Sequence, residues 1–370
     1  MAEPRSARAI FCRGIQRPLW VLIVMFGILN LLALLAKNFK AHLQDLELIT
    51  YPSKQSPYSN WSTHGVTPVR CHSHNDHWRH VPLHSALSAG CISVEVDIWP
   101  WRDEILVGHS KHTVLRGSLK SLYLDPLVTM LDMHNHPSSS EVPDGENMDD
   151  NKDGNKVDIF GVFANDPTQT LVLLVDSKAD GDALWPLLLE ALAPLRERGY
   201  LTHFNESAGG VSMRPITVVA SGNISFSDVL SSATYRDVFF DAPLDHLTQF
   251  TVDETVNRTT TVHNDPNARL LGSPFNPNNS YYASVDFRKA IGSLQLGRFS
   301  DTQLQTLRGQ VQAAHELGLK VRYWGNPSWP IGLRNLVWDF LLSEDVDVIS
   351  TDDLKGATRQ VWWHSSWWSW

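Results

Sequence analysis

The stretch that decides the fold opens with Cys71-His72-Ser73-His74-Asn75-Asp76 and resumes with Val94-Glu95-Val96-Asp97. In both pieces, polar side chains follow or interrupt a short apolar run, as they do where a strand ends at a functional rim. Glu95 and Asp97 are two residues apart, so a strand places them on the same face. Val107-Gly108-His109 then returns another imidazole along a predicted hairpin. Two imidazoles and a Glu-x-Asp pair indicate a divalent cation and acid–base chemistry on a phosphate ester.

Outward from this stretch, short β-like runs alternate with amphipathic segments. The predicted helices include 183–197, 301–317 and 332–342. The predicted strands number eight and cover 66–71, 92–98, 171–176, 215–220, 238–241, 281–286, 320–324 and 347–350. This alternation predicts an α/β fold, a closed parallel TIM (β/α)8 barrel. An open doubly wound sheet is the alternative, but no Gly-x-Gly-x-x-Gly follows the first strand to favour its dinucleotide-binding form.

The polar residues at the predicted strand ends form one candidate site, because the C-terminal ends of barrel strands share a rim. Glu95, Asp97 and Asp176 form an oxygen cage that suits one Mg²⁺ or Ca²⁺ ion. Lys178 could hold Asp176 or stabilise a phosphoryl oxygen. The remaining candidates are His74 and His109 as acid and base, His72 as an alternative to His74, and Asn75 and Trp324 as substrate-binding residues. His134 lacks a strand-end position and is predicted to lie on the surface.

A second reading of the first motif is an amidohydrolase-like metal hydrolase. His72-Ser73-His74 has the His-x-His spacing that such barrels use after their first strand. They also need a Lys after strand four and His after strands five and six. Here those strands end in Ser221-Gly222, Asp241 and Asp286, and only Asp352 after the last strand would fit.

The N-terminal region predicts a membrane anchor. Residues 19–36 are apolar apart from Gly27 and Asn30, close to the roughly 20 residues that span a bilayer. Residues 1–18 carry four Arg against one Glu, so this basic tail is expected in the cytosol. An uncleaved anchor is favoured over a signal peptide, since residues 33–36 make a poor cleavage site.

The remaining chain divides into a stem at 37–65, the barrel at 66–358 with an acidic insertion at 136–168, and a Trp-rich tail at 359–370. The formal net charge of −9 argues against nucleic acid as a partner. The barrel is expected on the lumenal or extracellular side, where five Asn-x-Ser/Thr triplets after the anchor could be glycosylated: Asn60, Asn205, Asn223, Asn257 and Asn278. Cys71 and Cys91 would lie at opposite ends of neighbouring strands, so no disulfide is expected.

Read in order, the motifs resemble the phospholipase C-like phosphodiesterase superfamily, which includes glycerophosphodiester phosphodiesterases and spider sphingomyelinase D. The order is His, Glu-x-Asp, His, Asp-x-Lys, Tyr-Trp and Val-Asp-x-Ile-x-Thr. The fungal altered inheritance of mitochondria protein 6 is the most similar group, through His-x-His-Asn-Asp, Pro-Leu and Val-Glu-x-Asp-Ile-Trp. Glycerophosphodiesterases carry His-Arg-Gly where this chain has His74-Asn75-Asp76, so the Arg that would hold a phosphate is missing from that position.

The resemblance implies a TIM barrel over roughly residues 66–354 that hydrolyses a phosphodiester, with a glycerophospho- or sphingophospholipid-type substrate. It implies metal ligation by Glu95, Asp97 and Asp176, catalysis by His109 with His74 or His72, a lysine partner in Lys178, and a substrate-flanking Trp324. It also suggests a mitochondrial association. The alternative from another class is a non-catalytic, membrane-anchored barrel that binds lipid or a partner.

Overall fold

The computed structural model describes residues 20–33, 63–110, 117–135, 159–247, 273–295 and 297–359. The chain divides into two compact units, Met1–Thr50 and Tyr51–Trp370. In the first unit, residues 20–33 are helical. Within the described ranges, no helix is both long enough and apolar enough to cross a bilayer. The basic tail, nearly all of the stem, most of the acidic insertion and the Trp residues of the C-terminal tail lie outside the described residues.

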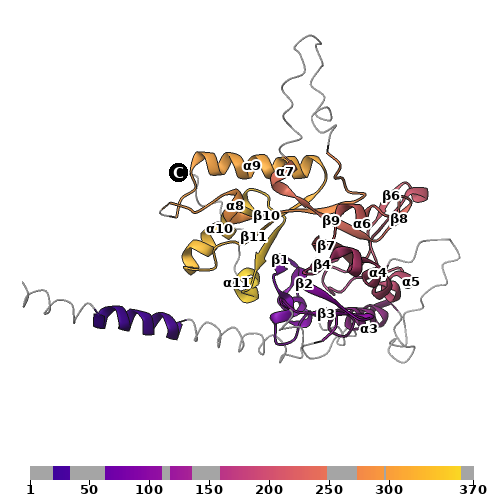
Figure 1. Ribbon diagram of the computed structural model, residues 1–370, viewed down its shortest axis with the longest axis horizontal. Coiled ribbons are helices and arrows are strands. Elements are labelled where there is room, and N and C mark those ends of the chain that lie inside the picture. The colour runs from indigo at the N-terminus through magenta and orange to yellow at the C-terminus, as the bar shows by residue number, and fades with distance from the viewer. Residues whose placement is uncertain are drawn as a thin grey trace, which may run out of the picture. The chain divides into compact units, whose positions relative to one another are not determined.

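The second unit is built on a closed parallel barrel, which confirms the predicted fold and excludes the open sheet (Figure 1). Neighbouring strands follow the order β1-β12-β11-β10-β9-β7-β4-β2, and β1 also pairs with β2, which closes the ring. The strands are β1 Val69–Ser73, β2 Cys91–Trp101, β4 Leu171–Ser177, β7 Ile216–Gly222, β9 Val238–Pro243, β10 Ser280–Asp286, β11 Lys320–Trp324 and β12 Val348–Thr351.

Helices surround the strands, and the three predicted amphipathic segments are among them (Figure 1). Among the described residues the longest helix is α9, which starts where Ser300 and Gln303 form a capping box that satisfies two free backbone N–H groups. The α-helices are α2 His84–Ala89, α3 Asp125–Asn135, α4 Gly181–Ala191, α5 Ala193–Glu197, α6 Phe226–Val229, α7 Leu244–Leu247, α8 Phe287–Ala290, α9 Asp301–Glu316, α10 Ile331–Ser343 and α11 Leu354–Arg359. The short turns are η1 Asp76–Trp78, η3 Lys120–Leu124 and η4 Glu206–Ala208.

Two smaller strand arrangements accompany the barrel. The strand β3 Glu104–Val107 runs antiparallel to the end of β2, which confirms the predicted hairpin that returns His109 to the rim. A separate three-stranded sheet joins β6 Gly210–Ser212, β5 His203–Asn205 and β8 Tyr235–Arg236. The sequence analysis did not predict this sheet, because its strands are only two or three residues long.

The core has two parts, because alternate side chains of each strand face opposite ways. A large apolar cluster lies between strands and helices. A smaller cluster inside the barrel consists of Val172, Leu174, Val219, Tyr282 and Val348. Polar and charged side chains from β1, β2, β9 and β11 occupy the interior beyond the small cluster, and they contribute to the candidate site described below.

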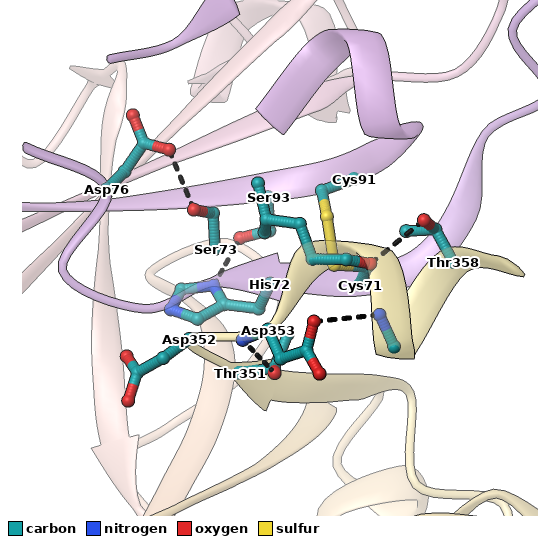
Figure 2. The surroundings of a disulfide bond; sticks show 12 residues. Cys71, His72, Ser73, Asp76, Cys91, Ser93, Thr351, Asp352, Asp353 and Thr358 are labelled. Carbon is teal, nitrogen blue, oxygen red and sulfur yellow. Dashed lines mark hydrogen bonds between the residues drawn. A yellow bond between two sulfur atoms is a disulfide. The ribbon is translucent and has the colours of Figure 1, made fainter. Parts of the chain in front are cut away.

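Cys71 and Cys91 form a disulfide with a Cα–Cα distance of 4.4 Å, so the prediction of no bridge is wrong (Figure 2). The prediction placed Cys71 at the end of the first strand, but β1 runs on to Ser73 and Cys71 is its middle residue. In the β1–β2 register, Val69 lies opposite Cys91, and an irregularity follows before His72 pairs with Ser93. The two cysteines are therefore neighbours, and both are fully buried.

Candidate active site

The first rim histidine, His74, follows β1 directly. Its Nδ1 donates a hydrogen bond to Asp352 Oδ1 at 2.8 Å, just beyond the neighbouring strand β12. Its Nε2 lies 3.9 Å from Glu95 Oε1, and its side chain is 31% exposed. Burial alone would lower the pKa of His74, but the hydrogen bond to Asp352 and the charge of Glu95 raise it overall. His74 is thus a solvent-accessible base with one ring nitrogen fixed by a carboxylate.

The second rim histidine, His109, is placed by the β2–β3 hairpin. Its Nδ1 donates to Asp97 Oδ2 at 2.7 Å, and its side chain is 53% exposed. The turn before it is fixed twice, because the Gly108 N–H donates to the Asp97 carbonyl and the Trp99 indole N–H donates to the Gly108 carbonyl. His109 therefore repeats the arrangement of His74. In both residues a carboxylate accepts a hydrogen bond from Nδ1, and Nε2 is the nitrogen that could exchange a proton with a ligand.

Three carboxylates gather beside these histidines, as the sequence predicts. Glu95 and Asp97 lie on β2, and Asp97 pairs in register with Asp176 on β4. One oxygen from each of the three lies within 4.8 Å of the others. Lys178 Nζ lies 2.6 Å from Asp176 Oδ2 and 3.3 Å from Asp97 Oδ1. Burial raises the pKa of Asp97, although the Lys178 charge opposes that rise.

The donor set of this cluster suits a hard divalent cation. Asp97 Oδ1 is buried and accepts no hydrogen bond from the described part of the chain, although the Lys178 ammonium is close. A buried carboxylate oxygen that accepts no hydrogen bond depends on nearby positive charge to offset its desolvation cost. Carboxylate oxygens are ligands that Mg²⁺ and Ca²⁺ prefer. Glu95, Asp97 and Asp176 could therefore hold one such ion.

His72, the alternative first histidine, occupies a different place. The predicted strand ended before His72, but β1 includes it, and its fully buried ring faces the barrel interior. Its Nε2 donates to Glu95 Oε2 at 2.9 Å. Its Nδ1 accepts from the Ser93 hydroxyl at 2.7 Å (Figure 2). Burial, with help from the Arg322 charge, lowers the pKa of His72 to about 4. His72 lies beneath the rim, whereas His74 lies on it.

Arg322 links the interior to the rim and is absent from the residues that the sequence motifs predict. Arg322 is the middle residue of β11, and its guanidinium donates to Glu95 Oε2 at 2.9 Å and to Asp241 Oδ2 at 3.1 Å. All three side chains are almost completely buried. A signal was available, because Arg322 is two residues before Trp324 and must share its face of the strand.

The two predicted substrate-binding residues lie near the site but differ in access. Trp324 ends β11 opposite Asp286 and is half-buried. Asn75 is buried in a left-handed conformation with φ 48°, and its amide nitrogen lies 3.2 Å from His74 Nε2. The next residue, Asp76, fixes this turn by accepting from the Ser73 hydroxyl at 2.7 Å and from the Leu83 N–H at 2.6 Å.

Two further histidines were misjudged or missed. His134 is buried, not on the surface, and its Nδ1 donates to the Gly161 carbonyl at 2.9 Å. His134 lies near the end of α3 and not at the end of a strand, so the strand-end pattern did not select it. The residue is nevertheless on the buried side of this helix. His77 in η1 is also buried, with Nε2 4.0 Å from Asp97 Oδ2. The amidohydrolase alternative finds no further support, because the ends of β7, β9 and β10 supply no Lys or His.

The comparisons with known proteins agree with the resemblance drawn from the motifs. Residues 61–241 match the family model of the AIM6-like phosphodiesterase domain. The chain is 35% identical over 325 residues to an altered inheritance of mitochondria protein 6 homolog from Arthroderma benhamiae, covering 85% of this chain and 91% of that protein. Altered inheritance of mitochondria protein 6 from Eremothecium gossypii is 31% identical over 306 residues, covering 79% and 69%. The Saccharomyces cerevisiae protein of that name is 29% identical over 309 residues, covering 80% and 72%. No solved structure matches the chain.

Proposed function

Because this chain belongs to the altered inheritance of mitochondria protein 6 family, with its phosphodiesterase domain, we propose that it is a metal-dependent phosphoric diester hydrolase. One observation carries the proposal. Two imidazoles, each with a carboxylate on Nδ1, lie on the same rim as three carboxylates that could share a cation. Such a rim supplies the acid, the base and the electrophilic stabilisation that phosphodiester cleavage requires.

The two histidines divide the proton transfers in this proposal. Asp352 holds His74 and Asp97 holds His109, so each ring keeps Nε2 as its reactive nitrogen. One Nε2 removes the proton from the attacking hydroxyl, which comes from water or from the substrate itself. The other Nε2 donates a proton to the leaving oxygen.

Charge on the phosphoryl group is the second requirement. Glu95, Asp97 and Asp176 would hold one Mg²⁺ or Ca²⁺ ion, which when bound supplies positive charge for the phosphoryl oxygens. The Lys178 ammonium, between Asp97 and Asp176, can contact the same oxygens. Asn75 and Trp324 lie beside His74 and at the end of β11, where they could orient the substrate. We propose a glycerophospho- or sphingophospholipid-type diester as that substrate.

The proposed location is a membrane, with residues 19–36 as a single anchor and the barrel in the lumen or outside the cell. The disulfide supports an oxidising compartment, since such bridges are rare in the cytosol. The relatives' name, which refers to inheritance of mitochondria, supports a mitochondrial association as the alternative. A non-catalytic barrel that binds lipid or a partner is the competing function.

Turnover of bis(4-nitrophenyl) phosphate by the full-length protein tests the proposal. Activity should disappear in excess EDTA and return with Mg²⁺ or Ca²⁺. Asp97→Asn should remove activity while the circular dichroism spectrum stays unchanged. Full turnover in EDTA or in Asp97→Asn would exclude the metal mechanism, and no turnover of this diester or of a phospholipid panel would favour the binding barrel. Product analysis from the panel would distinguish a cyclic from a linear phosphate.

A further inference from the structure

Directly beneath the rim, the barrel interior contains a buried charged layer. It consists of Glu95 from β2, Arg322 from β11 and Asp241 from β9, with His72 beside Glu95. The side chains of Glu95, Arg322 and Asp241 are 7%, 4% and 4% exposed. The interior cluster described above, by contrast, contains only Val, Leu and Tyr. The side chains that face the barrel interior thus change from apolar to charged just below the candidate site.

Stability does not explain this layer. Removing charges from water costs several kcal/mol per ion, and well-packed apolar side chains often replace buried ion pairs without loss of stability. The layer also contains two carboxylates and one guanidinium, so it retains one negative charge. A purely structural interior would avoid this imbalance, and the contacts of Arg322 indicate another role.

Arg322 is held on two sides, and its Nη1 lies against Glu95 and 3.1 Å from His72 Nε2. Its Nε donates to the Ser284 hydroxyl at 3.0 Å, and its Nη2 donates to Asp241 Oδ2 at 3.1 Å. Its Nη1 then donates to Glu95 Oε2 at 2.9 Å. A planar guanidinium bound at three points has little rotational freedom, so the position of Nη1 is set by Asp241 and Ser284.

These contacts also determine which oxygen of Glu95 faces the site. Arg322 and His72 both donate to Oε2. Oε1 instead lies 3.9 Å from His74 Nε2 on the rim. Oε2 is therefore committed to the interior, and Oε1 is the oxygen available to a ligand. A Glu side chain without this restraint could rotate and present either oxygen or neither.

We infer that Arg322, fixed by Asp241, is a positioning residue that holds Glu95 with Oε1 toward the rim. It acts through Glu95 and does not touch the substrate. The inference deepens the proposed function and rests on it where Glu95 is taken as a metal ligand. Groups that orient metal ligands in this way commonly change metal affinity about 10- to 100-fold when they are removed.

The test compares two variants of the full-length protein, each of which breaks a different buried ion pair. Arg322→Met combined with Asp241→Asn removes the positioning pair and leaves the net charge of the layer unchanged, which favours folding. Arg196→Met is the control, since Arg196 makes a two-point ion pair with the buried Asp237 just before β9, at the opposite end of that strand. Manganese binding is measured through the electron paramagnetic resonance signal of free Mn²⁺.

The double variant should bind Mn²⁺ at least about tenfold more weakly than the natural protein. Arg196→Met should change the affinity less than threefold. On a Glu95→Gln background, the double variant should add less than threefold, because Arg322 acts only through Glu95. Equal Mn²⁺ affinity in the double variant and the natural protein, or fully additive losses with Glu95→Gln, would overturn the inference.

Crystal structures of the same variants separate this inference from the proposed function. If the natural protein binds no Mn²⁺, the metal mechanism fails, but the position of Glu95 still decides the role of Arg322. Glu95 Oε2 should leave its contact with His72 in the double variant and keep it in Arg196→Met. An unmoved Glu95 in the double variant would overturn the positioning role.

Discussion

At the scale of residues, the site depends on how each imidazole is fixed. Asp352 and Asp97 accept from Nδ1 of His74 and His109, so these bonds fix the orientation of each ring and of its Nε2, the nitrogen proposed to react. His72 has the opposite character, because both of its nitrogens are occupied inside the barrel. Chain spacing alone could not separate His72 from His74, since the two differ by whether the strand ends before or after His72.

Alanine substitutions test the assignment of the two rim histidines. His74→Ala and His109→Ala should each reduce kcat on a water-soluble diester by about 10²-fold or more, because each removes a proton-transfer group. The pH dependence of kcat in the natural protein should be bell-shaped, and each variant should lose one limb. His203→Ala, in the small antiparallel sheet, is the control and should retain full activity. An active His74→Ala enzyme would reassign the first histidine.

Burial of His134 predicts an acid-dependent loss of stability. Burial lowers the pKa of His134 to about 4 in the folded protein, against the ordinary histidine value of 6.5. The neutral, buried His134 therefore contributes fully to the free energy of unfolding above pH 6.5. This contribution is lost as the pH falls from 6.5 toward 4, because the unfolded chain then binds a proton that the folded protein does not. Urea unfolding at pH 7.5, 6 and 5 should show a smaller pH dependence of the unfolding free energy in His134→Asn. The prediction would be contradicted if the unfolding free energies of the natural protein and of His134→Asn changed equally with pH.

At the scale of elements, the alternation of short strands and helices was sufficient to predict the barrel. Short apolar runs and strand ends rich in Asp, Glu and His are local signals, and they located β2, β4 and the rim. Two sets of contacts depend on the register between strands, so the sequence could not predict which residues meet in them. Cys71 meets Cys91 because β1 and β2 are staggered, and Arg322 meets Glu95 and Asp241 across the barrel. The π-helical turn η3 also lacks a sequence signal.

The disulfide between β1 and β2 should stabilise the barrel. It links residues 20 apart in sequence, and closing a loop of that size is worth about 3 kcal/mol in the unfolded chain. Cys71→Ala with Cys91→Ala should lower the unfolding free energy by about 2–4 kcal/mol, measured by urea denaturation. Cys12→Ser, which leaves the pair intact, should have no effect. An unchanged urea midpoint in the double variant would show that the bridge contributes nothing.

At the scale of the whole molecule, the disulfide and the Asn-x-Ser/Thr triplets bear on the same question of compartment. Asn223 and Asn278 are exposed on the barrel, at the ends of β7 and before β10, so attached sugars would not disturb the core. Asn205 has less freedom, because its side-chain oxygen accepts the Ser207 N–H at the start of η4. A barrel that is both bridged and glycosylated must have folded on the far side of a membrane from the cytosol.

The topology prediction follows from that argument and from the charge asymmetry around residues 19–36. In microsomes from cells that express the full chain, endoglycosidase should increase the electrophoretic mobility of the protein, and Asn278→Gln should remove part of that shift. Protease added to sealed vesicles should spare the barrel and digest it only after detergent is added. A tag at residue 1 should be lost without detergent, because the proposed orientation puts the Arg-rich segment in the cytosol. An unglycosylated barrel that external protease digests in sealed vesicles would reverse the proposed orientation. Free thiols at Cys71 and Cys91 in the same sample would place the barrel in a reducing compartment.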